Sequence, residues 1–139
     1  YTGYKQLSMT PDELIVGIQI PLPSTHEHLK LYKVSKRTHL DISTFTAAIR
    51  LKEKGGTIDD VVIAYGGVGP VVLRLPKTEE ALKGQTFNAA SFEKAGQVAR
   101  SEITPITDVR GDKAYRLQLA ENILMKFYAE ISEPAEVCL

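Results

Sequence analysis

The sequence has few of the features that mark secreted, membrane-bound or nucleic-acid-binding proteins. It has one cysteine, Cys138, so no internal disulfide can form, which is typical of a protein from a reducing compartment such as the cytoplasm. Its 17 basic and 17 acidic side chains cancel, which gives no electrostatic reason to expect nucleic acid or an anionic membrane as partner. No apolar run reaches membrane-spanning length, and no segment has the pattern of a signal peptide.

Motifs for nucleophilic, phosphate and metal chemistry are also missing. The sequence contains no Gly-x-Ser-x-Gly motif and no Cys/His pair for a nucleophile. The glycine-rich run at 66–70 lacks the Lys-Ser/Thr of a phosphate loop, so a bend or close backbone approach explains it better. His26 and His28 would share one face of a strand, but no cysteine or third histidine accompanies them, which argues against a metal site.

Alternating apolar residues predict strands in the first half of the chain. The clearest pattern spans 14–20, where one face carries Leu14, Val16, Ile18 and Ile20 and the other Ile15, Gly17 and Gln19. Further strands are predicted at 28–36, 42–52 and 58–65, with a short extended piece at 71–75. The Lys54-Gly55-Gly56 run predicts the turn between two of them.

Helical spacing predicts three helices in the second half. They cover 78–84, 91–103 and 112–131, with Thr78, Ser91 and Asp112 as N-terminal caps and Pro134 beyond the last end. The last helix has an apolar stripe made of Leu117, Ala120, Leu124, Phe127 and Ile131. Strands followed by helices predict one α+β domain over 1–139, an antiparallel sheet of about four strands with three helices on one face.

Two clusters of charged residues are candidates for function. The corner at 36–41 contains Lys36, Arg37, His39 and Asp41. It is either a solvated turn or a rim that faces an anion or an electron-rich ring through Lys33 and Arg37. The second cluster, Asp108, Arg110 and Arg116, flanks the entry of the last helix; we favour a structural role, capping or bridging helix and sheet, over ligand binding. Ile15, a large apolar group on the minor face of its strand, either lies at the surface or touches a flat ligand or a neighbouring domain.

Four segments, in order along the chain, carry a family resemblance. They are Ser8–Ile15 with Ile20-Pro21; Tyr32-Lys33 with Arg37 and Asp41-Ile42-Ser43; Ala64–Val68 with Glu80, Leu82 and Gly84; and Ile106, Asp108, Arg110, Tyr115 and Arg116. Together they resemble the C-terminal domain of the FAD-binding portion of molybdenum hydroxylases, the family of xanthine dehydrogenases and the carbon monoxide dehydrogenase medium subunit. The chain departs from the animal xanthine dehydrogenase pattern at 38–40, which leaves the substrate open.

The resemblance implies a role in a flavin site. It implies that Lys33 and Ile15 lie against FAD, where a lysine would stabilise the reduced, anionic flavin. It also implies that a preceding FAD-binding domain holds most of the dinucleotide, and that partner domains or subunits carry the molybdopterin and iron–sulfur clusters. Electrons would pass from those clusters through FAD to NAD or another acceptor.

The start of the sequence at Tyr1 bears on two competing hypotheses. A start without methionine, directly before an expected strand, suggests a domain cut from a longer flavoprotein, not catalytic by itself. The alternative is a stand-alone interaction module that has this fold and docks onto a partner without touching flavin.

Overall fold

The protein is built on a four-stranded antiparallel sheet. In the computed structural model, which describes residues 1–133, the strands are β1 (Glu27–Val34), β2 (Phe45–Lys54), β3 (Thr57–Gly66) and β4 (Leu73–Arg74). They lie in the order β1-β2-β3-β4, and every neighbouring pair is antiparallel. The glycine turn between β2 and β3 was predicted correctly, and Gly55 and Gly56 both have positive φ there.

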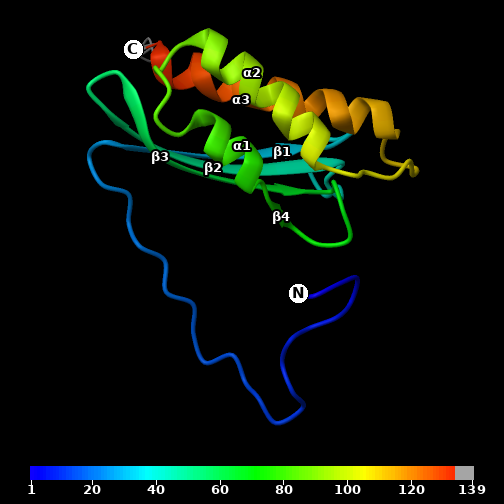
Figure 1. The fold of residues 1–139 in the computed structure, drawn as a ribbon. Coiled ribbons are helices and arrows are strands. Elements are labelled where there is room, and N and C mark those ends of the chain that lie inside the picture. The colour runs from blue at the N-terminus through cyan, green and yellow to red at the C-terminus, as the bar shows by residue number, and fades with distance from the viewer. Residues whose placement is uncertain (134–139) are drawn as a thin grey trace.

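Three helices cover one face of this sheet (Figure 1). They are α1 (Pro76–Leu82), α2 (Ala89–Glu102) and α3 (Lys113–Ser132). This arrangement confirms the predicted α+β architecture. Within residues 1–133, no helix has both the length and the apolar character needed to cross a membrane.

The core lies between the helices and the covered face of the sheet. Alternate residues of β2 are buried, namely Phe45, Ala47, Ile49 and Leu51, and the same alternation continues in β3. From α3, Ala120, Leu124 and Phe127 are fully buried, which confirms the centre of the predicted stripe. Tyr65 packs edge-on to Phe45 and donates its hydroxyl to the Ala120 carbonyl, so one buried aromatic joins sheet and helix.

Two of the three helices, α1 and α2, have N-terminal caps other than the predicted ones. Asp112 caps α3 as predicted, accepting from the Tyr115 amide. The cap of α2 is Asn88, which accepts from the amide of Ser91, the residue predicted as cap. Thr78 does not cap α1 but is buried in its first turn, where its hydroxyl donates to Glu102 of α2. A contact between two helices therefore replaces the local cap.

Residues 1–26, which we call the N-terminal segment, lie on the side of the sheet opposite the helices (Figure 1). The predicted strand at 14–20 is absent: these residues belong to no strand, and their apolar side chains are exposed. The prediction was wrong for this structure because no described strand lies beside them to pair with their backbone. Short-range contacts such as the Gly3–Gln6 bridge do occur earlier in the segment. Cys138 and Pro134 lie outside the described residues.

Candidate functional site

The sheet face away from the helices, which we call the open face, carries small and apolar side chains together with charged ones. Its members follow from the strand register, because paired residues share a face. Lys33, Thr46 and Gly66 form one row, and the next row is Leu31, Ala48, Ala64 and Arg74. The two central strands thus present small side chains, while Leu31 on the outer strand is 74% exposed. Such a surface lets a planar group or another backbone approach closely.

One end of the open face has its charges paired. Arg50 bonds Glu27 at 2.9 Å and also donates to Asp60. The hydrogen bond from Arg50 lowers the pKa of Asp60, and the bond to Asp60 raises the pKa of Arg50. This trio is a closed ion-pair network, partly exposed to solvent.

The opposite end of the open face carries Lys33. The side chain of Lys33 is exposed and makes no hydrogen bond or ion pair within residues 1–133. Lys30, three residues earlier, points to the covered side, where its ammonium lies 3.7 Å from Glu130 of α3. Tyr32 donates to the same carboxylate at 2.9 Å. The two lysines of β1 therefore serve different sides of the sheet.

The basic corner runs from Ser35 to Thr44 and is longer than predicted, because β1 ends at Val34 and β2 begins at Phe45. Arg37, the second cation of the predicted rim, bonds to other residues of the corner. Its guanidinium donates to the Leu40 carbonyl, and its backbone amide donates to the Asp41 carboxylate. Lys36 donates to the Val109 carbonyl at 2.8 Å. These bonds shape the corner, so Lys33 is the cation of this region that remains available for a ligand.

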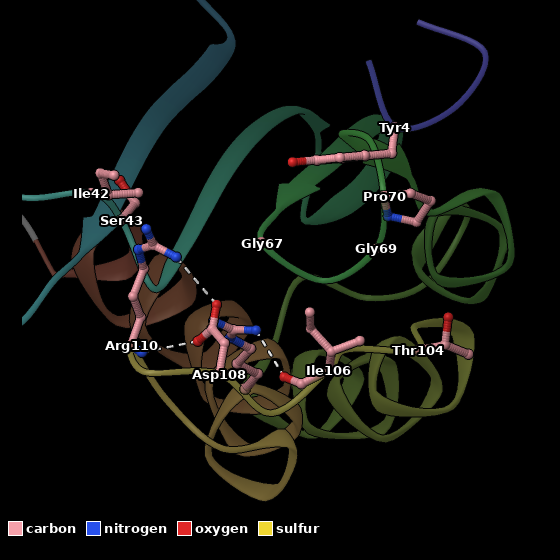
Figure 2. Close-up of a pocket in the computed structure, with 11 residues that line it drawn as sticks. Tyr4, Ile42, Ser43, Gly67, Gly69, Pro70, Thr104, Ile106, Asp108 and Arg110 are labelled. Atoms are coloured by element: carbon pink, nitrogen blue, oxygen red, sulfur yellow. Dashed lines mark hydrogen bonds and ion pairs between the residues drawn. The ribbon is translucent and has the colours of Figure 1, made fainter. Parts of the chain in front are cut away.

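A pocket of about 530 Å³ opens beside this corner (Figure 2). It lies between the glycine run that follows β3, the start of β2 and the loop that joins α2 to α3. Its walls include Ile42, Gly67, Pro70, Ile106 and Arg110, and the ring of Tyr4 from the N-terminal segment borders it. Residues of the folded body and of the N-terminal segment therefore both line this pocket. It lies at the end of the sheet that carries Lys33.

The α2–α3 loop on this pocket is fixed by a buried arginine. Arg116 of α3 is only 3% exposed; it donates to Asp108 at 2.6 Å and to the Ile106 carbonyl at 2.8 Å. Asp108 also accepts from the amides of Arg110 and Gly111. Hydrogen bonds from Arg116 and from the Arg110 amide lower the pKa of Asp108 to about 2. The contacts are structural, as favoured from the sequence, but Arg116 bridges α3 and the loop rather than helix and sheet.

Thr44, which sequence reasoning did not single out, ties this loop to the sheet. It is buried, and its hydroxyl donates to the Arg110 carbonyl at 3.0 Å. Its own carbonyl lies only 2.6 Å from where a Cβ would stand on Gly67, whose φ is +78°. A close backbone approach thus explains this glycine, as predicted, and no local signal in the sequence marked Thr44 as its neighbour.

The two candidate metal ligands do not form a strand pair. His28 lies in β1, whereas His26 precedes the strand. Within residues 1–133, no group of three or more histidine, cysteine, aspartate or glutamate side chains is arranged to hold a metal ion.

The structure does not place Ile15 on a strand, although the sequence predicted one at 14–20, so Ile15 and Lys33 are not strand neighbours. β1 has β2 as its one neighbour in the sheet, and Ile15 lies in the N-terminal segment, 66% exposed. Lys33 belongs to the open face, and the N-terminal segment that contains Ile15 lies on the same side of the sheet (Figure 1).

Comparisons with known proteins point to one family. The family model for the CO dehydrogenase flavoprotein C-terminal domain matches residues 30–131. Xanthine dehydrogenase 1 of Arabidopsis thaliana is 30% identical over 95% of the chain, and the xanthine dehydrogenase of Calliphora vicina is 27% identical over 96%. In each case the chain spans only 10% of the relative.

A solved structure agrees in fold. The CO dehydrogenase from Oligotropha carboxidovorans matches with a TM-score of 0.82 and 27% identity, over 91% of this chain and 44% of that one. An Escherichia coli (strain K12) protein assigned as the FAD-binding subunit of a xanthine dehydrogenase is 24% identical over 94% of the chain and 45% of its own length. The chain therefore belongs to the CO dehydrogenase flavoprotein C-terminal domain family.

Proposed function

We propose that residues 1–139 form the C-terminal domain of the flavin portion of a xanthine-dehydrogenase-like molybdenum hydroxylase. In this role the domain completes a FAD site held mainly by a preceding domain. Electrons reach the flavin from iron–sulfur clusters and leave to NAD or another acceptor. The molybdopterin and the clusters belong to partner domains or subunits, and the enzyme is cytoplasmic, as the single cysteine favours.

The observation that carries this proposal is the position of Lys33. Its side chain stands without a polar partner among the described residues, at one end of an exposed sheet face whose central strands carry small residues there. The neighbouring positions Thr46 and Gly66 are small, and Ala48 and Ala64 continue the surface. A planar ring fits such a surface, and an ammonium at its edge stabilises negative charge on the reduced ring. The other charged groups of this face are paired, as Arg74 is with Glu79 and Arg50 is with Glu27, so Lys33 contributes an unpaired positive charge at its end of the face.

Residues of the chain suited to this role are few. Lys33 would hold and polarise the flavin edge, and Ile15 would contact the ring from the N-terminal segment. When bound, FAD supplies the electron-carrying chemistry, and the chain supplies position and charge. No dinucleotide-binding loop occurs in the sequence, so we expect the isolated chain to fold without retaining FAD. Flavin absorbance near one equivalent in the purified chain would contradict this expectation.

The test is a redox titration of the flavoprotein that contains this domain, as wild type and as Lys33→Met. Methionine keeps the apolar stem and removes the charge, so the flavin potential should fall. A charge pair about 4 Å apart at an effective dielectric near 20 is worth roughly 4 kcal/mol before desolvation. We expect a loss of at least about 1 kcal/mol, which is roughly 20 mV for a two-electron couple.

Lys30→Met is the matched control, because Lys30 lies on the same strand but faces α3. It should leave the flavin potential unchanged. If Lys33→Met also leaves the potential and the thermal stability unchanged, Lys33 is only a solvated strand residue. The chain would then fit the alternative, an interaction module of this fold that docks through its open face without touching flavin.

A further inference from the structure

Glu130, near the end of α3, binds the strand β1 through two side chains. The Tyr32 hydroxyl donates to one carboxylate oxygen of Glu130 at 2.9 Å, and the Lys30 ammonium lies 3.7 Å from the same oxygen. The other oxygen pairs with Lys126, one turn earlier in α3, at 3.1 Å. A single carboxylate therefore connects the helical layer to two alternate residues of β1 on the covered side of the sheet.

β1 depends on such a contact more than the inner strands do. It is the outer strand at one end of the order β1-β2-β3-β4, so among the described residues only β2 pairs with it along the sheet. None of its eight residues is fully buried, whereas alternate residues of β2 are buried under the helices. A strand with one neighbour and little burial opens more readily than an inner strand. The contact with Glu130 therefore supplies much of what holds β1 against the helical layer.

The hydrogen bond between Tyr32 and Glu130 has both groups in the protonation states that it needs. Burial and the hydrogen bond to Glu130 raise the pKa of the Tyr32 hydroxyl, so it remains a donor. Burial acts to raise the pKa of Glu130, but hydrogen bonds from Lys126 and Tyr32 outweigh it and lower this pKa. A hydrogen bond to an ionised acceptor is stronger than one between neutral groups. The contact with Lys30 is longer and partly exposed, so Tyr32 makes the main connection.

We propose that Glu130 is a positioning residue for Lys33: by holding Tyr32, it fixes β1 and therefore the distance between the Lys33 ammonium and the flavin. The inference rests on the proposed function, in which Lys33 lies at the flavin edge. Tyr32 and Lys33 are consecutive, so their side chains point to opposite faces of the sheet and their Cα atoms are about 3.8 Å apart. A movement of Tyr32 therefore carries Lys33 with it. Glu130 lies on the covered side, so it acts through the strand rather than by contact with the flavin.

Redox titrations of the flavoprotein that contains this domain test the role of Glu130. Moving an ammonium from about 4 Å to about 5 Å from a negative charge removes roughly a fifth of their interaction. Glu130→Ala should therefore lower the flavin potential, so that the ratio of reduced to oxidised flavin at a fixed applied potential falls by about 2-fold or more. Tyr32→Phe, which keeps the packed ring and removes the hydroxyl, should give a similar fall. Glu130→Gln keeps an acceptor for Tyr32 and should stay closer to wild type than Glu130→Ala does.

Glu121→Ala is the matched control, because Glu121 is also a carboxylate of α3 but pairs with Arg100 of α2. It should leave the flavin potential unchanged. A rise of the potential in Glu130→Ala would overturn the proposal, because the loss of a negative charge acting through space favours the anionic, reduced flavin. An unchanged potential in both Glu130→Ala and Tyr32→Phe would overturn it as well.

The Lys33→Met background separates this inference from the proposed function. If Glu130 acts through Lys33, Glu130→Ala should lower the potential of the wild type but cause no further fall in Lys33→Met. An equal fall in both backgrounds would overturn the positioning role and leave the flavin contact of Lys33 in place. An unchanged potential in Lys33→Met itself would refute the proposed function and this inference together.

Hydrogen exchange in the flavin-free flavoprotein tests the connection without the flavin. The amides of β1 that are protected in wild type should exchange about 10-fold faster in Glu130→Ala and in Tyr32→Phe, because a charge-assisted hydrogen bond is lost. Residues 47–51 of β2 should keep their protection, and Glu121→Ala should change neither strand. Exchange of β1 that is the same in all variants and wild type would show that Glu130 does not hold the strand, and would overturn the proposal.

Discussion

Two segments with nearly the same pattern have opposite surroundings in this molecule. In β2, the alternating residues Phe45, Ile49 and Leu51 are fully buried under the helices. In the N-terminal segment, Leu14, Val16 and Ile18 alternate in the same way and are more than 80% exposed. The difference lies in their neighbours: β2 pairs with β1 and β3, whereas residues 14–20 have no described strand beside them.

This contrast distinguishes residues that stabilise the domain from residues that add nothing to its stability in the chain alone. Burial of β2 supplies hydrophobic stabilisation within the chain, in proportion to the apolar area removed from water. Residues 14–20 supply none to the chain alone, although their composition has the same potential. The covered face of the sheet therefore holds the fold together, whereas the open face and the N-terminal segment leave apolar side chains exposed.

The largest expected difference between the two segments is tested by a matched pair of alanine substitutions in the 139-residue chain. Ile49→Ala should reduce the free energy of unfolding by about 2–5 kcal/mol, because it removes buried contacts and leaves a cavity. Ile18→Ala should change it by no more than about 0.5 kcal/mol, as for an exposed surface position. Urea denaturation monitored by circular dichroism measures both. A large loss from Ile18→Ala would show that residues 14–20 pack on the domain in solution.

A second pair tests the helical layer. Leu124 is fully buried in the centre of α3, so Leu124→Ala should also cost about 2–5 kcal/mol of unfolding free energy. Gln118 is exposed and bonds only polar neighbours, Arg100 and Asn122. Gln118→Ala should therefore shift the midpoint of denaturation little. Similar losses from the two changes would mean that α3 presents a different face to the sheet.

A third comparison concerns the glycine run beside the pocket. Gly67 and Gly84 both have φ near +78°, but only Gly67 has a backbone carbonyl where a Cβ would stand. Gly84→Ala should cost roughly 1–2 kcal/mol through left-handed strain alone. Gly67→Ala should cost clearly more, because Thr44 must also move. Equal losses in thermal denaturation would show that β2 can shift without cost at this end of the site.

The smallest effect is expected at the α2–α3 loop, and it should depend on pH. The pKa of Asp108 is about 2 in the folded chain, below its ordinary value of 3.8, because Arg116 and backbone amides favour the carboxylate. Its contribution to stability is therefore present above about pH 4 and disappears as pH falls through 2. Asp108→Asn should lower the denaturation midpoint at pH 7, and the difference from wild type should shrink on acidification. A difference independent of pH would contradict the ionic account.

The sequence predicted best what local chemistry decides. The turn at Gly55-Gly56, the Asp112 cap and the buried side of α3 each depend on residues close in the chain. The cap of α2 and the role of Thr78 were missed, because Asn88 outcompetes Ser91 and because Thr78 meets Glu102 only after the helices pack.

The candidate site divides in the same way. Residues of β1 alternate between the two faces of the sheet, and this alternation is visible in the sequence. It places Lys33 on the face opposite the buried residues of β2. The position of Ile15 could not be predicted, since its alternating pattern predicts a strand and no described strand lies beside it. An alternating pattern predicts which residues of a strand share a face, but it does not identify the strand that pairs with it.

The measurement that tests the whole account most directly is hydroxyl-radical footprinting of the 139-residue chain and of the flavoprotein that contains it. In the chain alone, Leu31, Val72 and Ile18 should be labelled readily, because all three are exposed. In the flavoprotein these side chains should lose most of their labelling, while Tyr115 and other exposed positions on the helical side keep theirs. Protection that falls on the helices and spares the open face and residues 14–20 would contradict the account.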